Sequence, residues 1–169
     1  MKTNEIISAI QKRRSIRKYK GDDIPDEIIE TILEAGRWAP SGQNNQPWKF
    51  VLIKDREFRK RLSKLTTSGR IIRESNTCIA VFYDLAEGYN RDKDILGIGA
   101  CVQNMLLAAH SLAVGSVWLG EILNRKNEVN ELLEIGQKYE LMAVIALGYP
   151  AESPHSSRRE RGSFVLKMT

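Results

Sequence analysis

The stretch "ILGIGACVQNMLLAAHSLAVGSVWLG", residues 95–120, is the longest apolar run of the chain, and the fold has to be built around it. Its length would suit a membrane span, but Gln103, Asn104 and His110 would then need polar partners inside hydrocarbon. Outside a membrane, a helix that is apolar on all sides is buried on all sides. A small domain rarely encloses such a helix by itself, so we expect it to pack against a second subunit in a homodimer.

Shorter segments on both sides of this run have the periodicity of helices and strands. Helices are predicted over about 3–13, 25–36 and 56–67, and strands over 48–55, 77–84 and 139–150. Thr3 or Asn4 can cap the first helix. The strand at 77–84 is almost continuously apolar, which predicts burial on both faces. Because helices separate the strands, we expect an α+β or α/β sheet covered by helices.

The composition is that of a globular protein. Of 169 residues, 42% are hydrophobic and 28% charged, which excludes disordered and fibrous classes. The length predicts one domain over 1–169, with a polar connection at 85–94 and an irregular tail at 150–169. The net charge of +5 indicates an anionic partner without choosing among nucleic acid, membrane and small phosphates. The N-terminus has helical periodicity and no signal-peptide core, so we expect a cytoplasmic protein.

Cysteine and histidine give no reactive cluster. Cys78 and Cys101 lie among apolar neighbours without CxxC or Cys/His spacing, which favours buried free thiols over a disulfide or a redox site. His110 and His155 are too few and too far apart in the sequence to indicate a metal centre.

A basic cluster follows the first predicted helix, in "QKRRSIRKYKGDD" at 11–23. Arg13, Ser15 and Arg17 alternate where the chain leaves helical geometry, and alternate residues of extended backbone point the same way. Two guanidinium groups and a hydroxyl can then converge on one phosphate. The alternatives are a solvated charged face and a nucleic-acid surface, for which Tyr19 is the one aromatic nearby.

A polar loop interrupts the apolar pattern in "RWAPSGQNNQPWKF", residues 37–50. It is either a plain connection between helix and strand or an edge that binds a flat heteroaromatic ring through hydrogen bonds. Between Trp38 and Trp48 it presents the uncharged polar side chains of Ser41, Gln43, Asn44, Asn45 and Gln46.

Two glycine motifs are less specific. The Gly-x-Gly at 97–99 lacks the third glycine of a dinucleotide fingerprint and predicts close helix packing. In "VWLGEI", residues 117–122, Gly120 can either expose backbone N–H groups to a ligand or make a turn, and both interpretations stay open.

Taken together, these residues resemble the nitroreductase family of FMN-dependent oxidoreductases. The resemblance runs from end to end and rests on four segments: "RRSIRKY" (13–19), "LEAGRWAPSGQNNQPWKF" (33–50), "GACVQNMLLAAHSLAVGSVWLGE" (99–121) and "ALGYPAE" (146–152). The first two are specific in combination and at their spacing. Many family members carry a longer insertion that helps cover the active site, and this chain lacks it.

The resemblance implies an α+β fold with a mostly antiparallel central sheet, a long buried central helix, and a homodimer with FMN at the subunit interface. By position in the motifs, the FMN phosphate and ribityl chain would be held by Arg13, Arg14, Ser15 and Arg17. The other subunit would supply Pro40, Ser41, Gly42 and Asn44 to the flavin, and the ring would lie near Leu119, Gly120 and Glu121. Arg158 or Arg159 of the tail would also reach the phosphate, and the tail can cross to the partner.

The activity that the resemblance implies is a ping-pong transfer of electrons from NADH or NADPH through FMN to a small oxidised acceptor, such as a nitroaromatic or a quinone. The cofactor is the reactive group in such chemistry, so we expect no catalytic side chain, no metal, and no nucleic-acid or membrane partner. No dinucleotide motif chooses between NADH and NADPH. Two alternatives stay open: an FMN-binding protein without catalysis, and a basic nucleic-acid-binding protein.

Overall fold

The computed structural model describes residues 4–167. The strands are β1 (Trp48–Ile53), β2 (Thr77–Asp84), β3 (Gly115–Leu119) and β4 (Tyr139–Gly148). The α-helices are α1 (Glu5–Lys12), α2 (Asp26–Arg37), α3 (Arg56–Leu62), α4 (Gly69–Glu74), α5 (Arg91–Ser111) and α6 (Lys126–Leu132). Short 3-10 turns form over Gly42–Asn44 (η1), Ser63–Leu65 (η2), Glu121–Arg125 (η3) and Arg161–Phe164 (η4).

The sheet has the order β1-β2-β4-β3, and each pair of neighbours is antiparallel. This confirms the predicted mostly antiparallel α+β sheet. All eight residues of β2 are buried, as its apolar run predicted, because the strand lies inside the sheet with helices on both faces.

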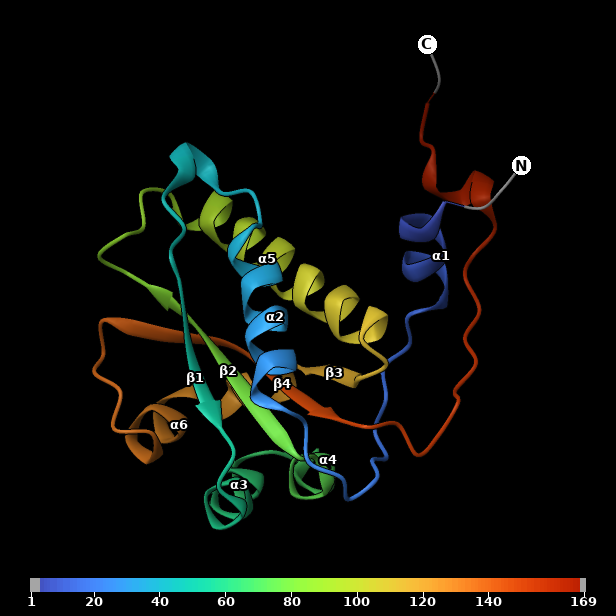
Figure 1. Cartoon of the computed structure of the whole chain (residues 1–169). Helices are drawn as coiled ribbons and strands as arrows, with labels where there is room; N and C mark the ends of the chain where they lie inside the picture. The colour runs from blue at the N-terminus through green and yellow to red at the C-terminus, as the bar shows by residue number, and fades with distance from the viewer. Residues whose placement is uncertain (1–3, 168–169) are drawn as a thin grey trace.

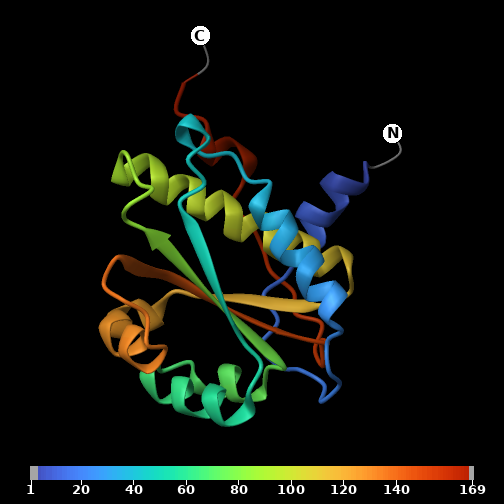
Figure 2. The same cartoon turned by 60° about the vertical axis from the view of Figure 1, so that its left-hand side comes forward.

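Helices form a layer on each face of the sheet (Figures 1 and 2). On one face α2 and α5 cover a core that includes Ile79, Ile145 and Met105, and on the other α3, α4 and α6 cover a second core that includes Phe82. Methionine and cysteine side chains of α5 fill the space beside Gly36 of α2, where an added Cβ would lie 2.7 Å from Met105 Cγ. The two helices therefore approach closely across a residue without a side chain.

The apolar run 95–120 contains two elements instead of one. The helix begins at Arg91, within the predicted polar connection, because Asn90 caps it and the polar residues 91–93 face solvent. It ends at Ser111, Ala113 takes a left-handed φ of 58°, and the chain reverses into β3. The strand at 115–119 was not predicted, because helix and buried strand share the same continuous apolar composition.

Other boundaries also differ from the prediction. The helix expected over 56–67 ends at Leu62 and continues only as a 3-10 turn. The first and third predicted strands end at Ile53 and Gly148, two residues early in each case. Helices α4 and α6 were missed, since each is only six or seven residues long and too short for a clear period. Asn4 caps α1 through its side chain, whereas Thr3 lies outside the described residues.

Two helices expose apolar side chains. Within the chain α5 buries one face only, and Leu96 on its other face is 75% exposed. Helix α1 buries no residue, and Ile6, Ile7 and Ile10 on its predicted apolar face are 67%, 47% and 48% exposed. The expected burial of α5 on all sides is therefore not reached inside one chain. Among residues 4–167, no helix has the length and apolar character that crossing a membrane requires.

Both cysteines are free and buried, as predicted. Burial raises the pKa of the Cys78 thiol to about 11 and that of Cys101 to about 12. These thiols therefore behave as small apolar core groups.

Candidate functional site

The basic segment after α1 is extended, as its alternation predicted. Ser15 forms an isolated parallel bridge with Ser116 of β3, and the Ile16 N–H donates to the Ser116 carbonyl at 3.0 Å. The Glu152 carboxylate accepts hydrogen bonds from the backbone N–H groups of Arg17 (2.6 Å) and Lys18 (3.2 Å). These contacts hold the segment between β3 and the chain that follows β4.

A cavity of about 210 Å³ lies where this segment meets the C-terminal tail. We call it the arginine cavity. Its lining residues are Arg13, Arg14, Ser15, Arg17, Pro154, His155, Ser156 and Arg158. All four predicted residues of the basic segment therefore come together, and Arg158 joins them while Arg159 does not line the cavity.

The arginine cavity is strongly cationic. Burial, and after it the positive charges of Arg14 and Arg158, lowers the pKa of Arg13. No aspartate or glutamate is among the lining residues that the structure describes. Guanidinium groups gathered without a carboxylate repel one another, and a phosphate dianion would relieve this repulsion through charge-assisted hydrogen bonds. The donors present thus fit the phosphate end of FMN.

The polar loop, residues 40–46, has a strained backbone. Gln43, Asn44 and Gln46 have φ values of 54°, 58° and 47°, and such left-handed conformations cost a residue other than glycine about 1–3 kcal/mol each. The Ser41 hydroxyl accepts a hydrogen bond from the Gln46 N–H at 3.0 Å, which closes the loop. Strain of this kind persists only where the surroundings impose it, and it is typical of binding sites.

Helix α5 and the chain before it hold the loop in place. A Cβ added at Gly97 would lie 3.3 Å from the Pro40 carbonyl oxygen and 3.6 Å from Ser41 Cα. The predicted close packing of the Gly-x-Gly motif is therefore confirmed at Gly97, here between helix and loop, but not at Gly99, where an added Cβ would meet nothing within 4 Å. At Gly42 an added Cβ would collide with the Tyr89 hydroxyl, so a side chain there would displace the Tyr89 ring.

The polar loop and the basic segment that lines the arginine cavity lie at opposite ends of α5 (Figures 1 and 2). The loop packs near Gly97, whereas His110 lines a larger cavity that also includes Arg14 of the basic segment. From Gly97 to His110 the helix rises about 20 Å. Burial, followed by the charges of Arg13 and Arg14, lowers the pKa of His110 and favours its neutral form.

Strand β3 runs from the arginine cavity to the segment 119–121, which the resemblance places near the flavin ring. Ser116 lies beside Ser15, and Gly120 follows about 13 Å further along the chain. Gly120 is exposed, its φ is −95°, and an added Cβ would meet nothing within 4 Å. The turn itself therefore does not require glycine, which favours the interpretation that Gly120 leaves backbone open to a ligand.

Glu121 binds the loop of Thr66 and Thr67 to the segment that follows β3. Its carboxylate accepts hydrogen bonds from the Thr66 hydroxyl and the Thr67 N–H, the second at 2.9 Å. The bond from Thr66 is the main cause of the lowered pKa of Glu121. Leu119, in contrast, is buried in the core at 5% exposure.

Sequence reasoning missed several residues around these sites. His155 and Ser156 line the arginine cavity, and Thr66 and Thr67 adjoin Glu121. None has a sequence signal of its own, because each comes from an irregular segment that tertiary contacts bring to the site.

Comparison with known proteins identifies the family to which the chain belongs. The family described as "Nitroreductase family" matches residues 10–74 and 66–149, which together include the basic segment, the polar loop, α5 and β3. The chain belongs to the nitroreductase family. A relative from Archaeoglobus fulgidus, named as a candidate NADH dehydrogenase/NAD(P)H nitroreductase, is 39% identical over 88% of this chain and 87% of its own length.

Solved nitroreductase structures share the fold over nearly the whole chain. One is a candidate nitroreductase of Desulfovibrio desulfuricans in complex with FMN, which has a TM-score of 0.96 and 43% identity, and the match covers 99% of this chain and 98% of that one. Another is the NADPH:FMN oxidoreductase of Vibrio harveyi complexed with NAD⁺, with a TM-score of 0.89, 25% identity, and coverage of 98% and 78%. The predicted nitroreductase fold and the predicted enzyme class, an oxidoreductase, are confirmed.

Proposed function

We propose that this nitroreductase uses FMN to pass electrons from NADH or NADPH to a small oxidised acceptor. The observation that carries the proposal is the arginine cavity, which Arg13, Arg14, Arg17 and Arg158 line, with no aspartate or glutamate among the described lining residues. It stands at the position of a family motif, in a chain 43% identical to a protein solved with FMN.

The arginine cavity and β3 supply one side of the proposed site. Arg13, Ser15 and Arg17 bind the phosphate, with Arg14 and Arg158 adding positive charge. Gly120 is exposed and directly follows the same strand, and the ring system would be held beside it. FMN held by these residues would supply the redox chemistry for a ping-pong transfer from NADH or NADPH to the acceptor.

The residues of this chain bind the cofactor, orient it and shield it from solvent. Cationic groups and backbone N–H donors favour negative charge on the bound ring system, and they are already in position before the reaction. No side chain of the site is required to act as a nucleophile. A nitroaromatic or a quinone suits the acceptor side, because a flat ring can stack where the polar loop and Gly120 leave the site open.

The polar loop belongs to the same site only in a dimer. In one subunit it is separated from the arginine cavity by about 20 Å of α5, so one cofactor cannot touch both. A second subunit packed on the exposed faces of α1 and α5 would cover Ile6, Ile10 and Leu96. It would also bring its own Pro40, Ser41, Gly42 and Asn44 to the flavin, which gives two sites per homodimer.

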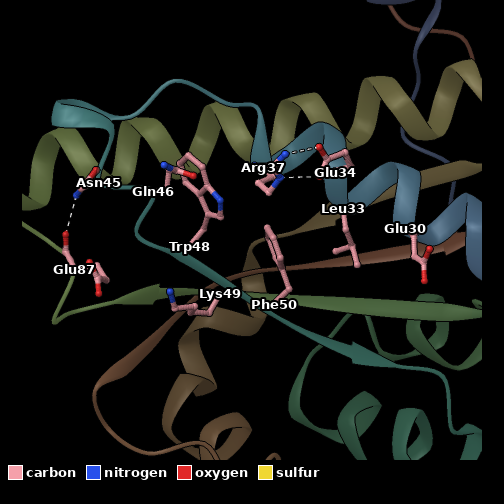
Figure 3. Close-up of a pocket in the computed structure, with 10 residues that line it drawn as sticks. All are labelled: Glu30, Leu33, Glu34, Arg37, Asn45, Gln46, Trp48, Lys49, Phe50 and Glu87. Carbon is pink, nitrogen blue, oxygen red and sulfur yellow. Dashed lines mark hydrogen bonds and ion pairs between the residues drawn. The ribbon is translucent and has the colours of Figure 1, made fainter.

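The C-terminal tail is a candidate for a second contact between the subunits. A groove of about 560 Å³ lies between α2 and the free edge of β1. Leu33, Trp48 and Phe50 are among the residues that line it (Figure 3). In the tail, Phe164 and Leu166 are 65% and 102% exposed. We propose that the partner's tail occupies this groove and pairs with the edge of β1. A chain ending at residue 161 should then form a less stable dimer, measured by its dissociation constant; an unchanged constant would contradict the crossing.

A visible absorption spectrum tests the function. The purified protein should be yellow, release FMN on denaturation, and lose its flavin absorbance when NADH or NADPH is added without oxygen. Bleaching by one nucleotide alone would identify the donor. A flavin that neither nucleotide bleaches would indicate binding without catalysis, and a colourless protein that refuses added FMN would contradict the proposal. A single domain over 1–169 and a cytoplasmic location remain predictions.

A further inference from the structure

A buried carboxylate lies beneath the polar loop. Asp94, in the first turn of α5, has no exposed surface. Its Oδ2 accepts hydrogen bonds from the Tyr83 hydroxyl (2.9 Å) and from the backbone N–H groups of Tyr89 (3.0 Å) and Asn90 (3.1 Å). Asp94 thereby joins β2, the connection that follows it and the start of α5.

The other oxygen of this carboxylate reaches the polar loop. Asp94 Oδ1 accepts a hydrogen bond of 2.8 Å from Asn45 Nδ2. The same amide donates to the Glu87 carbonyl at 2.9 Å, and Figure 3 shows this second bond. Both partners are pure acceptors, which determines the orientation of the Asn45 amide. Its own Oδ1 is buried and lacks a hydrogen-bond partner in the described part of the chain, so the two donated bonds are what hold it.

Asn45 lies between the strained residues of the loop. Asn44 precedes it and Gln46 follows it, both with positive φ. Fixing the side chain of Asn45 therefore fixes the backbone where it is least able to keep its conformation unaided.

We propose that Asp94 is a positioning residue, which acts through Asn45 to keep the polar loop in the conformation that meets the flavin of the partner subunit. This inference rests on the proposed function. The loop is prepared before the cofactor arrives, so binding does not have to order it. A purely structural role would instead stabilise the fold without changing the loop.

Asp84 offers a matched control. It is also a buried carboxylate, 5% exposed, and it supports the same connection by accepting a hydrogen bond from the Ala86 N–H at 3.1 Å. Its ion-pair partner is Lys49, at 3.6 Å. Asp84 makes no hydrogen bond to Asn45 among the described residues.

The first experiment compares Asp94→Asn with Asp84→Asn in the purified dimer by amide hydrogen exchange. An asparagine at position 94 turns an amide donor toward the Asn45 amide, so the link to the loop is lost. The N–H groups of Asn44, Asn45 and Gln46 should then exchange about tenfold faster or more. In Asp84→Asn they should exchange as in the wild type. Equal exchange of the loop in all three proteins would overturn the proposal.

The second experiment measures FMN affinity by fluorescence titration in a double-mutant cycle. Asp94→Asn and Asn45→Ala should each weaken FMN binding about tenfold or more. The double variant should lose no more affinity than the single variant with the larger loss. If the losses of FMN affinity in the two single variants add up in the double variant, Asp94 does not act through Asn45. If Asp94→Asn fails to fold, Asn45→Ala alone must still accelerate exchange in the loop, or the proposal fails. A wild type that binds no FMN would instead refute the proposed function, while hydrogen exchange would still test the link.

Discussion

At the scale of single residues, the basic cluster divides into cavity-lining and surface charges. Alternation brings Arg13, Ser15 and Arg17 to one cavity, whereas Lys18 and Lys20 of the same run are exposed and do not line it. Position along the backbone, more than the amount of charge, decides which cations can bind one phosphate.

Arg13→Ala tests this division. It should weaken FMN binding by about 1.5–3 kcal/mol, the contribution of a hydrogen bond between charged groups. Isothermal titration with FMN measures the change. Lys20→Ala removes the same charge outside the arginine cavity and should leave the affinity within about 0.5 kcal/mol of the wild type. Equal losses in the two variants would mean that only the general positive field matters.

Gly120→Ala tests whether glycine at this position serves the turn or the binding of FMN. With open space at the Cβ position and an ordinary φ, alanine should leave stability unchanged or raise it by about 0.4–1 kcal/mol. If the backbone at Gly120 meets the flavin, the added methyl group should nevertheless weaken FMN binding. Thermal unfolding and FMN titration of the same preparation give both values, and an unaltered affinity would remove Gly120 from the site.

At the scale of elements, short-range patterns predicted the strands and helices with a clear period. Strand β2 was predicted residue for residue, because its residues 78–83 form a near-continuous apolar run between the polar residues Thr77 and Asp84. Strand β3 was not, because the apolar run continues from α5 across it. Only its pairing with β4, for example Ser116 with Leu147, distinguishes it from the helix. Such pairing between residues far apart in the sequence does not change the local hydrophobic pattern from which strands are predicted.

Helix α1 belongs to the surface of one chain and, on our proposal, to the interior of a dimer. Ile6→Asp would place a charge in the interface and should shift the dimer toward monomer, with loss of FMN, in sedimentation velocity runs. Leu85 is 46% exposed on a different part of the molecule, so Leu85→Asp should leave the dimer intact. A stable, FMN-loaded monomer of Ile6→Asp would contradict the interface.

At the scale of the whole molecule, the proposed site is divided between subunits, and mixing can show it. Arg13→Ala impairs the arginine cavity. Asn44→Asp impairs the polar loop and keeps a residue type that tolerates its positive φ. When the two variants are dissociated, mixed and reassociated, half of the dimers should be hybrids, and each hybrid has one site with both partners intact. About a quarter of all sites should therefore regain wild-type FMN affinity; no recovery would place each site within one chain.

The sequence by itself determined the local features of this protein: the periods of α1, α2 and β2, the alternation of Arg13, Ser15 and Arg17, the polar composition of the loop, and the family motifs. These depend on neighbours within a few residues, and backbone geometry converts such spacing directly into direction. The tertiary structure alone decided that Arg158 and not Arg159 lines the arginine cavity, that Asp94 holds Asn45, and that loop and cavity lie at opposite ends of α5. Each of these depends on contacts between segments 49 or more residues apart, which form only when the sheet and its two helical layers pack together.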